Sequence, residues 1–206
     1  ARDDKLGMAN MLNNIGAVYF NQGYDMKAIE YYLKSLQISE EIHDTLRIAT
    51  ALVNIGSVYI KPKTYKQALQ YLSRSLPLSE ALGDQDAIGT SAVNIGEIYL
   101  KEGELDSAFI FFEMSLEAYK KSETGNIPYT LNNIGKVYAE KGQFTQAVKY
   151  QKEAFEIASR RNAKLEMAQA LVGLANTSIK MGSLHSAVNY FKQAQTLALE
   201  LEAPYE

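Results

Sequence analysis

The stretch LNNIGAVYF, residues 12–20, decides the fold because it returns three more times along the chain. The later copies are LVNIGSVYI (52–60), AVNIGEIYL (92–100) and LNNIGKVYA (131–139). Each copy has apolar residues at the three-to-four-residue spacing of an amphipathic helix. Each also carries an Asn and a Gly in its middle, although Gly costs a helix about 1 kcal/mol relative to Ala. A cost that recurs at the same place predicts a structural role for the Gly.

The copies are evenly spaced, which predicts a repeat protein. Counted from the Asn of each copy, positions 14, 54, 94 and 133 are followed by Gly173 in LVGLANTSI (171–179), so that one unit is 39 or 40 residues long. In every unit a second apolar segment follows the first, after a turn such as NQGYD (21–25) or EKGQF (140–144). Gly in these turns supplies the backbone freedom that a helix end favours. The sequence therefore predicts five helical hairpins, about ten helices and no strand.

An all-α, right-handed α-solenoid is the expected architecture, because stacked hairpins bury apolar stripes that no single hairpin can bury alone. We expect residues 1–206 to form one solenoid of five tandem helical hairpins, with repeats that start near residues 9, 49, 89, 128 and 168. Asp4 aligns with Asp44 and Asp84, so we interpret residues 1–8 as the end of a preceding repeat or a cap. Residues 203–206 are interpreted as the start of a truncated further helix.

A longer pattern of small and aromatic residues runs through the hairpins: a small residue three before an aromatic, a Gly turn, then an Ala, an aromatic and a small residue. It is carried by Gly16, Tyr19, Gly23, Ala28, Tyr32 and Ser35, and again by Gly96, Tyr99, Gly103, Ala108, Phe112 and Ser115. This pattern resembles the tetratricopeptide repeat (TPR) family. The unit exceeds the usual length of about 34 residues and is similar to the subtype in Pins/LGN spindle adaptors and in many bacterial signalling and regulatory proteins.

The last two repeats depart from this pattern. Gln151 stands where an aromatic residue is expected, and Ala175 and Ser178 replace the Gly and the Tyr of the motif. We expect these repeats to pack more loosely than the others.

On a helical wheel, the Gly of the motif lies among the apolar residues and faces the second helix of its own hairpin. We expect it to let the two helices approach closely. The Gly residues are Gly16, Gly56, Gly96 and Gly135, and the expected contacts are Ala28, Ala68, Ala108 and Ala147.

The Asn of the motif lies on nearly the opposite side of the helix, on a polar stripe that would form the floor of a concave groove. The predicted groove residues are Asn14, Asn54, Asn94 and Asn133, with Asn21, Lys61, Lys101, Tyr129, Lys136, Asn176 and Lys180. A carboxamide presents both a donor and an acceptor, which suits the backbone of an extended peptide. In Pins/LGN-like domains this Asn is a peptide contact, and the resemblance implies that role for the four Asn residues of the motif. The alternative is that the carboxamides bond to the adjacent repeat or are solvated.

Three hypotheses for function follow. The first is a protein-protein interaction scaffold that binds an extended peptide of a partner protein along the groove. The second is a sensory or regulatory segment of a larger bacterial signalling protein, such as a kinase or a transcription regulator. The third is self-association, either through the open ends of the solenoid or through Ile110 and Met114, a possible convex contact where other second helices carry polar residues.

Composition and motifs exclude other classes of function. A net charge of −3 without a basic stripe argues against nucleic acid. The absence of Cys, and two His residues without metal-ligand spacing, argue against a metal site or cofactor. No catalytic or phosphate-binding motif is present, so we predict no enzyme. No apolar run reaches the length of a membrane span, so we expect no membrane insertion. The groove lacks Arg, which argues against carboxylate-clamp binding of chaperone tails. The compartment is unknown, with the cytoplasm slightly favoured over a periplasmic sensor segment.

Overall fold

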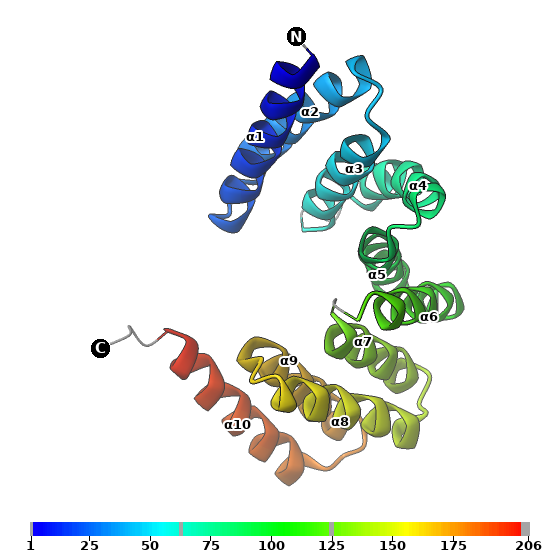
Figure 1. Ribbon diagram of the computed structural model, residues 1–206. Helices are drawn as coiled ribbons and strands as arrows, with labels where there is room; N and C mark the ends of the chain where they lie inside the picture. The colour runs from blue at the N-terminus through cyan, green and yellow to red at the C-terminus, as the bar shows by residue number, and fades with distance from the viewer. Residues whose placement is uncertain (1, 62–63, 124–125, 203–206) are drawn as a thin grey trace. The chain divides into compact units, whose positions relative to one another are not determined.

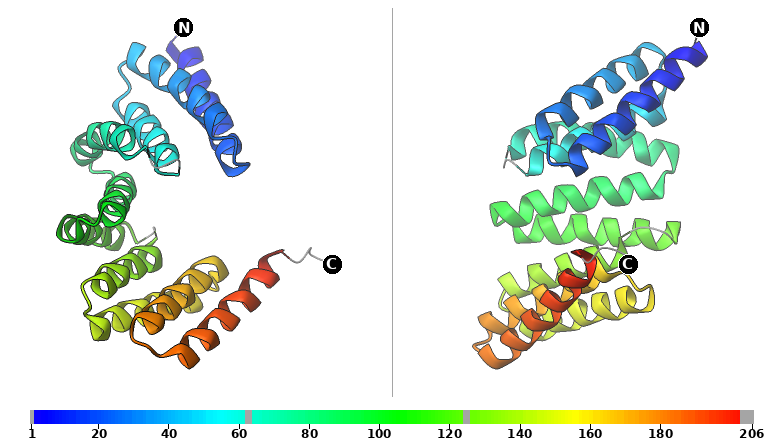
Figure 2. Two further views of the ribbon diagram at one scale, coloured as in Figure 1. Left: turned by 180° about the vertical axis from the view of Figure 1, so that it is seen from behind. Right: turned by 90° about the vertical axis from the view of Figure 1, so that its left-hand side faces the viewer.

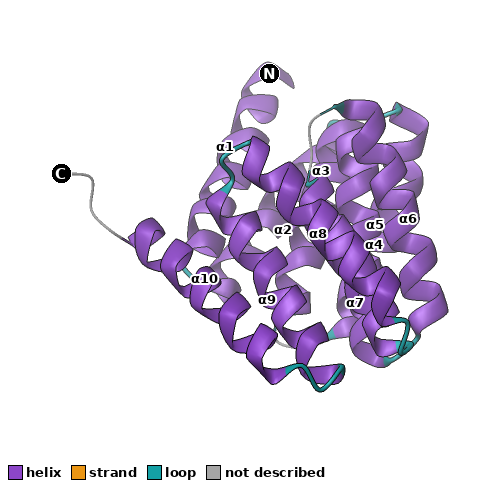
Figure 3. Ribbon diagram, turned by 90° about the horizontal axis from the view of Figure 1, so that it is seen from below, coloured by secondary structure: helices purple, strands orange, loops and turns teal. Residues whose placement is uncertain are grey.

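A computed structural model describes residues 2–61, 64–123 and 126–202, and these residues form ten helices in tandem and no strand (Figure 1, Figure 3). The all-α prediction is therefore confirmed. The helices are α1 (Arg2–Asn21), α2 (Asp25–Glu41), α3 (Thr45–Ile60), α4 (Tyr65–Leu82), α5 (Gln85–Glu102), α6 (Leu105–Ser122), α7 (Ile127–Glu140), α8 (Phe144–Arg160), α9 (Lys164–Lys180) and α10 (Leu184–Glu202). The further helix expected at 203–206 lies outside the described residues.

The first helix is longer at its start than the sequence alignment suggested. Asp44 and Asp84 precede their helices, and their side chains accept hydrogen bonds from Arg47 N and Ala87 N, each at 3.0 Å. Asp4 instead lies inside α1, because that helix already begins at Arg2. Residues 2–8, interpreted above as the end of a preceding repeat or a cap, thus form one continuous helix with the first copy of the motif.

The helices pack into two compact units, one within residues 1–98 and the other within residues 99–206, with the boundary inside α5. In the first unit α1 packs on α2, α2 on α3, and α3 on α4; in the second α9 lies beside both α8 and α10 (Figure 2). That all five hairpins form one solenoid stays a prediction.

The first helices of neighbouring hairpins pack more closely on one another than the second helices do. Close backbone contacts join α1 to α3 and α7 to α9. Among the described residues, α2 and α4 instead meet through the ion pair of Arg74 Nη2 with Glu40 Oε1 at 3.0 Å, and no close backbone contact joins α8 to α10. The odd-numbered helices therefore form the more closely packed side of each unit. We call this side the inner side.

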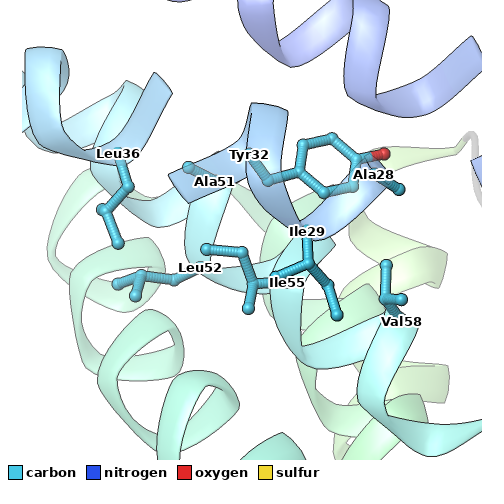
Figure 4. Close-up of a cluster of buried hydrophobic side chains, with 8 residues drawn as sticks. All are labelled: Ala28, Ile29, Tyr32, Leu36, Ala51, Leu52, Ile55 and Val58. Atoms are coloured by element: carbon cyan, nitrogen blue, oxygen red, sulfur yellow. The ribbon is translucent and has the colours of Figure 1, made fainter. Parts of the chain in front are cut away.

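Apolar side chains fill the space between consecutive hairpins. Figure 4 shows one such cluster, in which Ala28, Ile29, Tyr32 and Leu36 of α2 meet Ala51, Leu52, Ile55 and Val58 of α3. None of these eight side chains is more than 8% exposed. Burial of each large aliphatic or aromatic side chain contributes about 1.5–3 kcal/mol to stability, so contacts of this kind hold one repeat to the next.

The predicted close approach at the motif Gly is present. A Cβ added to Gly16 would lie 2.7 Å from the Tyr32 ring, and one added to Gly56 would lie 2.6 Å from Leu72 Cγ. One correction follows from these distances: the nearest group is the side chain four residues after the expected Ala. Ala68 contributes only its backbone carbonyl, 3.3 Å from the added atom at Gly56.

The hairpin turns are closed by the same backbone bond in successive repeats. Tyr24 N donates to Tyr19 O at 2.9 Å, and Gln143 N donates to Tyr138 O at 2.8 Å. This six-to-one bond is that of a Schellman motif, which requires a left-handed residue. Gly142 supplies it before Gln143, with a φ of 73°. The predicted role of Gly in the turns is confirmed.

We predict that Gly56→Ala lowers the free energy of unfolding by about 1–3 kcal/mol, as overpacked cores do. The new methyl group would press on Leu72, which is fully buried and cannot move aside. Gly7→Ala is the matched control, because nothing lies within 4 Å of an added Cβ there. Gly7→Ala should stabilise α1 by up to about 1 kcal/mol through helix propensity. Urea titrations followed by circular dichroism measure both variants, and equal stability of the two would contradict the packing role of Gly56.

Candidate binding face

The predicted groove residues lie on the inner side, but their exposure varies. In the first unit Asn14, Asn21 and Lys61 are exposed, whereas Asn54 and Asn94 are partly buried. In the second unit Lys101, Asn176 and Lys180 are exposed, whereas Lys136 and Tyr129 are partly buried. Asn133 is only 1% exposed. We refer to these residues together as the inner stripe.

Two carboxamides of the inner stripe bond to the preceding repeat. Asn54 Nδ2 donates to Asn13 Oδ1 at 2.9 Å, and Asn94 Nδ2 donates to Ser57 Oγ at 2.7 Å. Ser57 donates its own proton to Val53 O at 2.9 Å, so that its oxygen can only accept from Asn94. This fixes the orientation of the Asn94 carboxamide and leaves its oxygen as the atom that can receive a further donor.

A pocket of about 310 Å³ opens beside α1 and α3 in the first unit. Its lining includes Asn10, Asn13, Asn14, Arg47 and Thr50. The Arg47 guanidinium bridges two of its neighbours: Nε donates to Asn10 Oδ1 and Nη1 to Asp44 Oδ2, both at 2.8 Å. Arg47 was not among the predicted groove residues. Arg47 precedes Asn54 by seven residues, which is close to two helical turns and places it on the same face.

Lys61 is held at the end of α3 by α1 and α2. Its Nζ lies 3.9 Å from the centroid of the Phe20 ring and 3.4 Å from Asp25 Oδ1. The cation–π contact and the ion pair both fix this predicted groove residue against the first hairpin.

In the second unit the motif Asn is withdrawn from the surface. Asn133 Oδ1 accepts a hydrogen bond from Lys136 Nζ at 2.8 Å, and its burial differs from the predicted place on a groove floor. Helix α7 is packed on α6, α8 and α9, which leaves this position less open than the corresponding one in α1. Nearby, Lys180 Nζ pairs with Glu140 Oε2 at 2.8 Å.

Tyr129 lies at a different pocket of the second unit. This pocket, of about 220 Å³, is lined by Asn126, Tyr129, Leu165, Glu166 and Gln169. Tyr129 is thus on the inner stripe but apart from Lys136 and Lys180, which line another pocket together.

Asn132 fills the space that the missing Asn of the last repeat would have used. A Cβ added to Gly173 would collide with Asn132 Oδ1. Asn132 Nδ2 meanwhile donates to Gln169 O at 3.2 Å, so the α7 side chain is tied to α9. The sequence offered a signal that we did not use, because an Asn at 132 and a Gly at 173 are both departures from the second and third repeats.

Gln151 is packed more tightly than the sequence suggested. It is fully buried, and its Oε1 accepts a hydrogen bond from Thr177 Oγ1 at 2.9 Å. Ala175, the other departure from the motif, is also fully buried. The expected looser packing is therefore wrong at these two positions, since Thr177 supplies the donor that Gln151 needs.

The convex contact predicted on α6 is exposed at one of its two residues. Ile110 is 61% exposed, whereas Met114 is partly buried. Both line a hollow of about 520 Å³ with Glu113, Leu116 and Glu117. Self-association through these residues stays a prediction.

No group of three or more His, Asp or Glu side chains among the described residues is arranged to hold a metal ion. Three tyrosines of the helix interfaces have shifted acidity, because burial raises the pKa of Tyr32, Tyr59 and Tyr150. In the described parts of the chain, no helix combines the length and hydropathy needed to cross a bilayer.

We predict that Asn94 and Ser57 are energetically coupled. Asn94→Ala and Ser57→Ala should each destabilise the protein, and the double variant should lose less than the sum of the two. The difference should be about 0.5–1.5 kcal/mol, the usual net contribution of one hydrogen bond. Urea unfolding of the four proteins gives this coupling energy. Full additivity would show that the bond between repeats contributes nothing.

Several solved structures have the same fold, and two of those named below are complexes. A Rap protein in complex with competence and sporulation factor is 21% identical at a TM-score of 0.84, over 95% of this chain and 55% of that one. The Rap conjugation gene regulator of plasmid pLS20, in complex with the Phr* peptide, is 20% identical with a TM-score of 0.79. The match covers 97% of this chain and 55% of the regulator. BtubC from P. vanneervenii is 16% identical with a TM-score of 0.75. The match covers 96% of this chain and 82% of BtubC. At these identities the likeness shows the fold alone.

No curated protein matches this chain in sequence. The family model described as tetratricopeptide repeat, however, matches residues 7–81, 47–121 and 126–200. These segments cover most of the chain and contain every copy of the repeated motif, and so the chain belongs to the tetratricopeptide repeat family.

Proposed function

We propose that this chain is a protein-protein interaction scaffold that binds an extended peptide segment of a partner protein along the inner stripe. The observation that carries this proposal is the fixed orientation of carboxamides on α3 and α5. Asn54 and Asn94 each donate a hydrogen bond from Nδ2 to the preceding repeat, which leaves the Oδ1 atom to accept from a further donor. The complex of the similar pLS20 Rap regulator with the Phr* peptide supports the same kind of ligand.

The chemistry of the stripe suits a main chain rather than one particular side chain. A carbonyl oxygen accepts from any peptide N–H, and an extended strand presents such groups at regular intervals. The pocket beside Asn14 and Arg47 can take a side chain projecting from that strand. Because a flexible peptide loses conformational entropy on docking, the affinity should be modest, near the micromolar range.

We infer in addition that the scaffold is not catalytic. The pocket of the first unit holds carboxamides and one Arg that is already paired with Asp44. These side chains do not include a nucleophile held next to a general base, which group-transfer catalysis requires.

A displayed library of random linear peptides tests the proposal directly. Wild-type protein should retain a subset of peptides. Asn14→Ala and Asn176→Ala should each weaken the selected peptides by up to about tenfold, the effect of one lost hydrogen bond. Both residues are exposed on first helices, so their replacement should leave the fold intact. Isothermal calorimetry on the selected peptides measures the change.

Asn189→Ala is the matched control, since Asn189 is an exposed Asn on the second helix α10. Its binding should equal that of the wild type. If wild-type protein retains no peptide, the proposal is overturned. If Asn189→Ala weakens binding as much as the other two variants do, the inner stripe is not the binding face.

A further inference from the structure

A pocket of about 200 Å³ opens on the inner side of the second unit, against α7, α8 and α9. The buried part of its lining is Gln151, Gly173 and Thr177, and the more exposed part includes Lys136, Asn176 and Lys180. Its volume is below the roughly 300–1,000 Å³ of small-molecule sites. A space of this size suits a single side chain of a larger ligand.

The buried lining contains a hydrogen-bond donor that is not used. Gln151 Oε1 is taken by Thr177, but Gln151 Nε2 has no hydrogen-bond partner among the described residues. An unpaired donor at a fully buried residue is unfavourable, and an incoming acceptor would relieve that penalty. The Thr177 hydroxyl donates its proton to Gln151 Oε1. The group of Gln151 that remains for a ligand is therefore Nε2, which can only donate and so requires an acceptor.

The charged lining favours a negative ligand. The charged side chains of the lining are those of Lys136, Lys180 and Glu140, whose formal charges add to +1. Glu140 is itself engaged by Lys180 at 2.8 Å. Leu100 and Ala139 add an apolar wall, against which the methylene groups of a Glu or Asp side chain can pack.

The two residues that make this pocket unusual are unusual in the sequence as well. Where Gln151 stands, the other repeats carry the apolar or aromatic Tyr32, Leu72, Phe112 and Phe191. Gly173 stands where the other four repeats carry Asn. The fourth and fifth repeats therefore combine, at their junction, a buried carboxamide from one with an inner position without a side chain from the other.

We propose that this pocket receives a carboxylate of the bound peptide, supplied by an Asp or Glu side chain. The inference rests on the proposed peptide-binding function and adds the chemistry of one ligand residue. Gln151 Nε2 donates to the carboxylate, and the lysine ammonium groups balance its charge.

The test uses peptides selected on the wild-type chain from a random linear library with amidated C-termini. Each Asp or Glu of a selected peptide is replaced in turn by Asn or Gln, and binding is measured by calorimetry. One acid-to-amide replacement should weaken binding to the wild type about tenfold, because the lost contact is charge-assisted. The variant Gln151→Leu/Thr177→Val should bind the acid and amide forms alike.

The double variant is designed to fold, because Leu72 and Val137 occupy the corresponding positions in other repeats. Circular dichroism and urea midpoints confirm its fold, and Lys149→Gln, which changes an exposed charge on α8, serves as the electrostatic control. Lys149→Gln should keep the full acid preference.

Three results would overturn the inference while leaving peptide binding intact. They are selected peptides without an acidic residue, equal binding of acid and amide forms by the wild type, and an unchanged acid preference in Gln151→Leu/Thr177→Val. If the acid-to-amide peptides regain the lost affinity when their C-terminus is left free, the pocket accepts a terminal carboxylate, and the side-chain source is overturned. Failure to retain any peptide would instead remove the proposed function, and this inference with it.

Discussion

The close packing of the two helices in each hairpin is the constraint on which the rest of the structure depends. At Gly56 an added methyl group would overlap Leu72, and at Gly135 it would overlap Gln151 in the same way. The helix-forming cost of the Gly is accepted because contact between the helices at this point sets where the next turn and the next hairpin begin. With that spacing fixed, first helices of neighbouring hairpins can touch, and the polar side chains between them come within hydrogen-bonding distance.

The inner stripe therefore serves stability and recognition with the same side chains. Asn94 holds Ser57 of the preceding repeat through its amide, while its oxygen remains as an acceptor. Side chains that are already fixed lose little rotamer freedom when a ligand arrives, which favours binding. Removal of such a side chain changes both stability and affinity, and so exposed neighbours such as Asn14 separate the two roles better.

Periodicity was sufficient to predict the helices and turns, because both depend on residues close in sequence. The spacing of the motif gave the hairpins, and the role of its Gly followed from the helical wheel. The helical wheel predicted which face of the helix Asn133 lies on but not how deeply it is buried. Its burial depends on the three helices packed around α7. Asn132 and Gln151 were undervalued for a related reason. Gln151 looks like a defect within its own repeat and is explained by Thr177 of the following one. Asn132 matches Asn13 of the first copy, and only the structure shows that it fits against Gly173.

The Asn132 side chain occupies the space beside Gly173, and this fit limits how freely the repeats of this chain could be recombined. Repeats that share one consensus can be duplicated, deleted or shuffled, since each junction is equivalent to every other. The junction between the last two repeats is not equivalent, because the α7 side chain occupies the place of one that α9 lacks. A copy of the last repeat grafted behind Val53 or Val93 would meet a shorter, apolar neighbour that neither reaches the space beside Gly173 nor donates to the Gln169 carbonyl. These two repeats thus form a matched pair that must be inherited, or engineered, together.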